Sequence, residues 1–161
     1  MKLHKTFIAL SLSLLSVSAF ASDQTDCSAN GGAFLTGTVM SSPKYASGKF
    51  IRGVQTSHTH LNLKADQDGS TYDVAMDNVF AVDYVKGANA MPRSLAAIKV
   101  GEHLEVCGVK YTSGTGIHWV HTNCGATPSH SAPNGWVKEL SATGTAGVNL
   151  ERSQTYCSLW N

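Results

Sequence analysis

Histidine, tryptophan and asparagine residues gather on one short segment of the sequence. His118, Trp119, His121 and Asn123 all fall within residues 116–124. Imidazoles bind transition metals and act as general acids and bases near neutral pH, so this segment is a candidate for metal binding or proton transfer. In a regular strand His118 and His121 would point to opposite faces, and only a bulge or turn between them would bring both imidazoles together.

A metal ion at this segment would need at least one further ligand. His130, in the loop of residues 125–135, and Asp77 are the candidates, and a divalent metal such as zinc would suit these ligands. The alternative is that the two histidines of the segment hydrogen-bond this loop while Trp119 and Trp136 pack as core aromatic residues. The residue types leave both alternatives open.

The loop after the histidine segment carries residues that would complete a surface site. A loop that returns over a strand has few reasons to carry tryptophan and histidine unless it packs against that strand. We therefore expect one site that combines His118 and His121 with this loop. Its predicted ligand contacts come from Trp119, Asn123, His130, Asn134 and Trp136.

A second pair of polar residues is predicted from strand pairing. Residues 58–65 and 72–77 alternate apolar and polar residues, and Asp68-Gly69 between them suits a two-residue type I′ turn. This turn would place His60 opposite Asp77. An aspartate that accepts from an imidazole N–H raises the basicity of the ring, as a general base requires. A solvent-facing hydrogen bond between the strands is the simpler alternative.

The histidine segment resembles the mark of an uncharacterised family of small exported bacterial proteins, a domain of unknown function. That mark is Gly-x-His-Trp-x-His, followed about a dozen residues later by Gly-Trp and an aliphatic residue. The matching positions here are Gly116, His118, Trp119, His121, Gly135, Trp136 and Val137, with further matches at Asp77-Asn78, Pro92-Arg93 and Val100-Gly101. Other members carry His-Asn in place of Asp77-Asn78, so the resemblance does not carry a metal ligand over to Asp77. It covers residues 37–137 and implies a shared fold and export rather than an activity.

The first 21 residues have the features of an export signal. A basic start with Lys2 and Lys5 precedes an apolar run up to Phe20, and residues 19–21 have the small-x-small pattern that signal peptidase accepts. The run is too short for a membrane span, and no later stretch is long enough. We expect the mature chain, residues 22–161, to be a single periplasmic or extracellular domain.

The four cysteines predict two structural disulfides. An exported chain with an even number of widely spaced cysteines and no C-x-x-C pair is typical of disulfides rather than of a zinc or redox site. The four cysteines allow three pairings. A hairpin over residues 102–124 with its turn at Thr115-Gly116 would set Cys107 opposite Cys124, which leaves Cys27 with Cys157.

The pattern of elements predicts an all-β fold. A strand near residues 33–40, the hairpin of 58–77, a short helix within 91–101 and the hairpin of 102–124 follow one another. This order is that of a small five-stranded OB-like barrel, an oligonucleotide/oligosaccharide-binding fold, with a β-sandwich as the alternative. The hairpin register sets Leu61 opposite Met76. From about residue 125 we expect an irregular C-terminal extension held by Cys157.

Charge and missing motifs narrow the function classes. The full chain has 12 Lys+Arg against 11 Asp+Glu; without Lys2 and Lys5 the balance is 12 − 2 = 10 against 11, a net charge of −1. This balance disfavours binding to nucleic acid by bulk charge. His58 and His103 have no identifiable partner and are expected on the surface. Two hypotheses remain: an exported, disulfide-stabilised binding module for a small polar ligand or a protein partner, or a secreted metal- or histidine-dependent hydrolase of phosphodiesterase or nuclease type. Whether the protein is an enzyme stays open.

Overall fold

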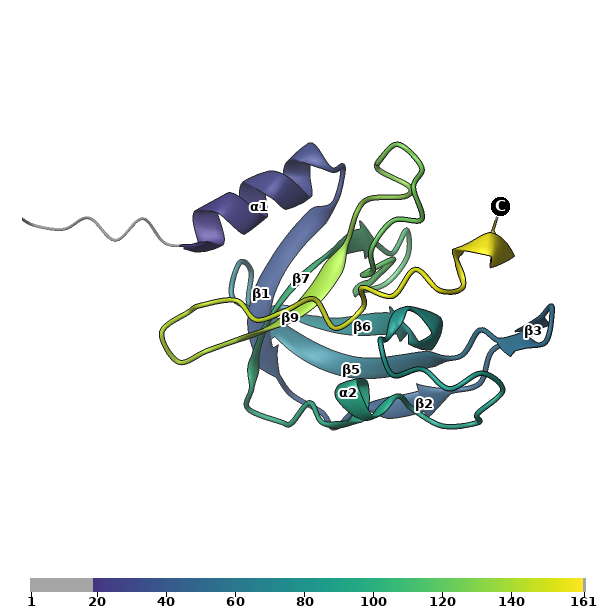
Figure 1. Cartoon of the computed structure of the whole chain (residues 1–161). Helices are drawn as coiled ribbons and strands as arrows, with labels where there is room; N and C mark the ends of the chain where they lie inside the picture. Colours follow the sequence, from purple (N-terminus) through teal and green to yellow (C-terminus); the bar gives the residue numbers. More distant parts are fainter. Residues whose placement is uncertain (1–18, 161) are drawn as a thin grey trace, which may run out of the picture.

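The computed structural model describes residues 19–160, and their side chains from residue 22 onward (Figure 1). The predicted export signal of residues 1–21 therefore lies outside the described residues, apart from the backbone of its last three. The chain is mostly β-structure with short helical pieces. Its helical elements are α1 (Ala19–Ala29), η1 (Asn78–Phe80), α2 (Arg93–Ala96) and η2 (Cys157–Leu159).

Five strands close into a barrel, which confirms the predicted all-β barrel fold with one short helix between its two hairpins. They are β1 (Ala33–Val39), β5 (His58–Ala65), β6 (Thr71–Asp77), β7 (His103–Lys110) and β8 (Gly116–His118). Neighbouring strands pair in the order β1-β5-β6-β8-β7, and β7 returns to β1. All these pairings are antiparallel except the parallel pairing of β6 with β8.

Four short strands lie outside this barrel. They are β2 (Lys44–Ala46), β3 (Phe50–Ile51), β4 (Val54–Gln55) and β9 (Trp136–Leu140). β2 extends the sheet beside β5, and β3 and β4 form a separate hairpin. β9 pairs with β7, so the chain after residue 125 contributes a strand to the sheet as well as irregular structure.

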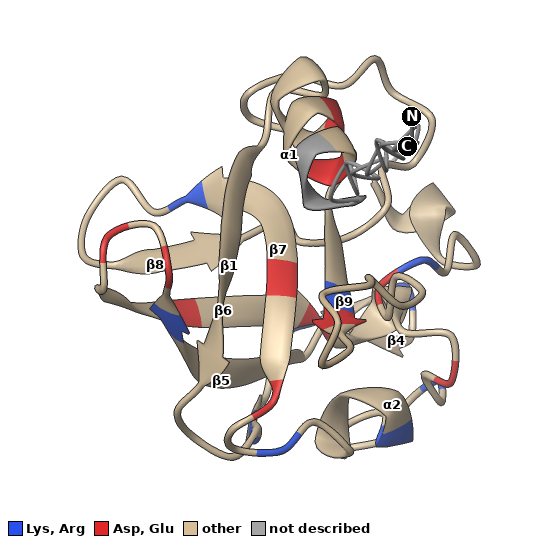
Figure 2. Cartoon of the chain, turned by 90° about the vertical axis from the view of Figure 1, so that its left-hand side faces the viewer, with Lys and Arg blue, Asp and Glu red and all other residues tan. Residues whose placement is uncertain are grey.

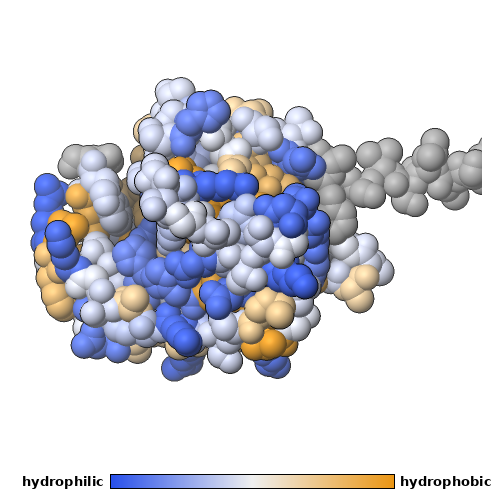
Figure 3. All heavy atoms as spheres, turned by 180° about the vertical axis from the view of Figure 1, so that it is seen from behind, coloured by the Kyte–Doolittle hydropathy of each residue, from blue (hydrophilic) through white to orange (hydrophobic). Residues whose placement is uncertain are grey.

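The barrel interior is filled by one face of each strand. In β5, Leu61, Leu63 and Ala65 are buried while Asn62 and Lys64 are exposed, as the alternation predicts. Fully burying an aliphatic side chain stabilises the fold by about 1.5–3 kcal/mol. Seen from behind, the outer surface shows apolar residues only in small separate areas (Figure 3).

The register of the β5–β6 hairpin differs from the prediction. Leu61 pairs with Val74 rather than Met76, and Asp77 pairs with His58 rather than His60. The connection runs through residues 66–70, because β6 begins only at Thr71. A shift of two residues keeps every apolar side chain on the same face, so hydrophobic alternation could not distinguish the two registers.

The predicted disulfide pairing is wrong. Cys27 is bonded to Cys107, and Cys124 is bonded to Cys157, with Cα–Cα distances of 5.7 Å and 5.3 Å. The prediction required β8 to run on to Cys124 opposite β7. Instead β8 ends at His118, which pairs with Val109.

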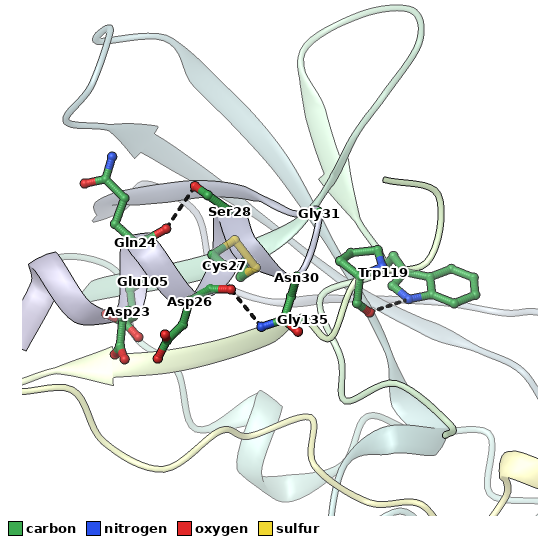
Figure 4. The surroundings of a disulfide bond; sticks show 12 residues. Asp23, Gln24, Asp26, Cys27, Ser28, Asn30, Gly31, Glu105, Trp119 and Gly135 are labelled. Carbon is green, nitrogen blue, oxygen red and sulfur yellow. Dashed lines mark hydrogen bonds between the residues drawn. A yellow bond between two sulfur atoms is a disulfide. The ribbon is translucent and has the colours of Figure 1, made fainter. Parts of the chain in front are cut away.

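The Cys27–Cys107 bond ties α1 to the barrel (Figure 4). Gly32 makes room for it, because a Cβ there would lie only 2.5 Å from the Cys107 sulfur. A partly buried charge cluster holds the same helix: Lys138 Nζ lies 2.7 Å from an Asp23 carboxylate oxygen and 3.0 Å from one of Glu105. Closing loops of this size is worth about 4 kcal/mol per disulfide in the chain-entropy account.

Charged residues are few and scattered. Lys and Arg occupy separate positions in the ribbon view rather than one continuous patch (Figure 2). None of the described helices is long and apolar enough to cross a membrane.

Candidate functional site

A pocket of about 400 Å³ opens where β6 and β8 end, with Trp160 of the C-terminal segment among its lining residues. This volume falls in the range of small-molecule sites. Its walls combine aromatic rings, imidazoles and one carboxylate. The lining residues are His58, Asp77, Phe80, His118, Trp119, His121, Asn123, Cys124, Ala126, Ala132 and Trp160.

Asp77 stands between two imidazoles at the end of β6. His58 Nε2 lies 2.6 Å from Oδ1, and His121 Nε2 lies 3.5 Å from Oδ2. The hydrogen bond from His58 to Asp77 raises the pKa of His58 above its ordinary value, against the opposing effect of burial. The observed register positions this pair, because His58 and Asp77 are direct cross-strand partners.

The imidazole of His121 is buried and favours its uncharged form. Its ring stacks on Phe80 with centroids 3.6 Å apart and planes 5° apart. Nδ1 donates to the backbone carbonyl of Thr122 at 3.0 Å, so Nε2 carries the lone pair in the neutral ring. Burial lowers the pKa of His121, which keeps the ring in this form near neutral pH.

Trp119 turns the chain so that both histidines of the segment reach the pocket. Its φ of +54° is a left-handed conformation that ordinary residues adopt at a cost of about 1–3 kcal/mol. The indole Nε1 donates to the carbonyl of Pro133 at 3.1 Å, which helps to hold this turn. The left-handed residue breaks the strand between His118 and His121, and both side chains therefore line the same pocket.

The C-terminal segment closes one side of the pocket. Trp160 stacks on Phe80 with ring centroids 5.3 Å apart, and the Cys124–Cys157 bond fixes the segment to the pocket rim. Gln154 Nε2 donates to the carbonyl of Asn123 at 2.8 Å. Three chain segments that are distant in sequence thus form the site: the β5–β6 hairpin, residues 118–132 and the C-terminus.

A second carboxyl lies behind Asp77. Glu151 is fully buried, and no side chain among the described residues donates a hydrogen bond to its carboxyl oxygens. Burial and the neighbouring charge of Asp77 raise the pKa of Glu151 well above its ordinary value, against the opposing effect of the Asp77 backbone N–H, so the site favours the neutral acid.

The structure brings together part of the predicted site. His118, His121, Asp77, Trp119 and Asn123 all line the pocket. Asn134 lies behind them, where its side-chain oxygen accepts from the backbone N–H of Asn123 at 2.9 Å.

Three other predicted site residues lie elsewhere. His60 Nδ1 donates to the Asp73 carboxylate at 3.0 Å, outside the pocket lining. His130 Nδ1 donates to the carbonyl of Gly31 at 3.0 Å. Trp136 packs on the Cys27–Cys107 disulfide in a separate buried cluster.

Three aromatic or imidazole side chains that line the pocket were not among the predicted site residues: His58, Phe80 and Trp160. His58 has Asp77 as a partner, contrary to the expectation of an isolated surface residue, and His103 likewise has Asp66, 2.8 Å away. His58 could have been found from a correct register. Phe80 and Trp160 line the pocket because of the three-dimensional course of the chain. No local sequence pattern indicates such a contact.

No group of three or more His, Cys, Asp or Glu side chains within residues 19–160 has the arrangement to hold a metal ion. Comparisons of the chain with protein-family models, with curated proteins and with solved structures give no match.

Proposed function

We propose that this protein is an exported, disulfide-stabilised binding module of OB-like type, which holds a small polar ligand in the pocket beside Asp77. The proposed membership in the exported family rests on the His-Trp-x-His and Gly-Trp segments. Two disulfides favour an oxidising compartment outside the cytoplasm.

The composition of the pocket carries this proposal. Ligand sites are concave, largely apolar cavities with a few converging polar groups. Here Trp119, Phe80 and Trp160 supply the apolar walls, and Asp77 and His121 are the polar groups. Cross-linking by Cys124–Cys157 pre-organises the walls, which lowers the entropy cost of binding.

Filling the pocket tests the proposal. Ala126 lines the pocket and is exposed, so Ala126→Trp should block the cavity without disturbing the core. Ala142→Trp, in the exposed turn after β9, is the matched control. Saturation-transfer NMR with glucose, adenosine, benzylamine, benzyl alcohol and benzoate should detect at least one probe that binds the wild type and the control but not Ala126→Trp. Binding that survives Ala126→Trp, or no binding by any probe, contradicts the proposal.

A secreted hydrolase is the second candidate, and the contact between His58 and Asp77 favours it. An imidazole held at 2.6 Å by a carboxylate, with its pKa raised, has the arrangement of a general base. Hydrolysis of bis(p-nitrophenyl) phosphate or p-nitrophenyl acetate that is lost in His58→Gln would support this candidate. Equal rates for the two proteins would remove it.

A further inference from the structure

Two hydrogen-bond acceptors face each other at the base of the pocket. Asp77 Oδ2 and His121 Nε2 lie 3.5 Å apart. The carboxylate oxygen can only accept, and the imidazole nitrogen carries a lone pair because the opposite nitrogen donates to Thr122. Because the two acceptor atoms are this close, one donor group with two hydrogens can form a hydrogen bond to each of them.

The other polar contacts of Asp77 do not supply that donor. His58 donates to the other carboxylate oxygen, Oδ1. Asp77 also caps η1 without a side-chain hydrogen bond to the helix. Oδ2 therefore retains hydrogen-bonding capacity toward the pocket.

The charge of the pocket favours a cation. Among the described residues that line it, Asp77 is the only acid and there is no Lys or Arg. Glu151 behind it is also a carboxyl, which in either protonation state supplies no positive charge to compensate the carboxylate of Asp77. When His58 is neutral, an anionic ligand would meet this carboxylate without a counter-charge, whereas a cation would supply one.

Aromatic walls suit the body of the same ligand. Trp119 is half-buried and Trp160 is 46 % exposed, so each leaves ring surface open to the pocket. Tryptophan faces attract cations and pack against flat apolar groups.

We propose that the pocket binds a primary ammonium ion carried on a small flat apolar body. The ammonium group donates to Asp77 Oδ2 and His121 Nε2, and the body lies against Trp119 and Trp160. This inference rests on the proposed function, because it names the class of ligand that the binding module takes.

Protons compete with such a ligand. A protonated His58 neutralises the charge of Asp77, and a protonated His121 supplies the missing donor itself. Affinity for an ammonium ion should therefore rise with pH as these imidazoles lose their protons, until the amine loses its own. The other titratable or charged groups near His58 and Asp77 are His60 on β5, Lys44 on β2 opposite His60, Tyr111, His118 and Glu151.

Three matched probes test the inference by titration calorimetry or NMR. Benzylamine is the ammonium probe, benzyl alcohol is its neutral analogue, and benzyltrimethylammonium is a cation without an N–H. Benzylamine should bind at least about tenfold more tightly than either, because hydrogen bonds to charged groups are the strong ones. Asp77→Asn should remove that advantage and leave benzyl alcohol within about twofold. Asp73→Asn, on the same strand but outside the pocket lining, should leave benzylamine unchanged.

The outcomes separate this inference from the proposed function. Equal binding of benzylamine and benzyl alcohol, abolished by Ala126→Trp, would keep the binding module and overturn the ammonium ligand. If benzyltrimethylammonium bound as tightly as benzylamine, the proposed hydrogen bonds to Asp77 Oδ2 and His121 Nε2 would be overturned. Should Asp77→Asn fail to fold, the pH dependence in the wild type decides: benzylamine affinity must fall as the pH is lowered from 8 to 5, and benzyl alcohol affinity must stay constant. An unchanged benzylamine affinity over that range overturns the inference.

Discussion

Replacing Glu151 with glutamine should stabilise the protein at neutral and alkaline pH. The carboxyl is fully buried, accepts no side-chain hydrogen bond from the residues that the structure describes, and lies near the charge of Asp77, so its pKa is raised in the folded state. The folded protein then holds a proton that the unfolded chain releases above its ordinary pKa of 4.5. Wild-type stability therefore falls as the pH rises toward the folded pKa.

The slope of this effect follows from one proton. The free energy of unfolding of the wild type should fall by about 1.4 kcal/mol per pH unit in that window relative to Glu151→Gln. Below pH 4.5 the carboxyl of Glu151 and the amide of the glutamine are both neutral and similar in size. The free energies of unfolding of the two proteins should therefore differ little. Burial also raises the pKa of Glu105, to about 7. Its effect on the pH dependence of stability is the same in both proteins and cancels in the difference between their free energies of unfolding.

Urea denaturation followed by tryptophan fluorescence, with both disulfides intact, measures this difference at intervals from pH 4.5 to 8. Glu139→Gln, on the exposed face of β9, is the matched control and should stay within about 0.5 kcal/mol of the wild type at each pH. A difference between wild type and Glu151→Gln that does not change with pH would refute the reasoning. So would a wild type that is the more stable protein at pH 8.

Three further predictions concern the core, the site and the cross-links. Trp136→Ala should cost about 3–5 kcal/mol of unfolding free energy because the ring is buried, whereas Trp119→Ala should cost less because its ring is half-buried; equilibrium denaturation compares them. His58→Gln should lower stability by less than about 1 kcal/mol below pH 6.5, and this loss should vanish as the pH rises past the raised pKa of His58; denaturation at pH 5.5 and 8.5 checks this. Peptide mapping without reductant should recover only the Cys27–Cys107 and Cys124–Cys157 pairs.

Local sequence patterns predicted several elements of this fold. Alternation in residues 58–65 correctly assigned Leu61, Leu63 and Ala65 to the core, because side chains on a strand alternate between faces. The short helix predicted within residues 91–101 likewise corresponds to α2. Four residues of the histidine segment line the pocket, and their role in a site stays a prediction.

Alternation by itself could not determine register or the end of a strand. A shift of the register by two residues leaves every side chain on the same face of the sheet. The partner of Asp77 was therefore set by the length of the connection between β5 and β6, which is longer than the two-residue Asp-Gly turn that the sequence predicts. The left-handed Trp119 ends β8, and a tryptophan there carries no signal for positive φ. The wrong disulfide pairing followed directly, since it assumed a strand that runs to Cys124.

The sequence by itself determined which residues of β5 face the core and that the fold is a small β-barrel, and it singled out the segment of His118 and His121 by its residue types. These properties depend on the period and chemistry of neighbouring residues. Only the tertiary structure decided that Asp77 faces His58 and His121, that Phe80 and Trp160 wall the pocket, and that Glu151 lies buried behind it. Such contacts join residues far apart in the chain, and their geometry depends on register, on one left-handed residue and on where the disulfides anchor the two ends.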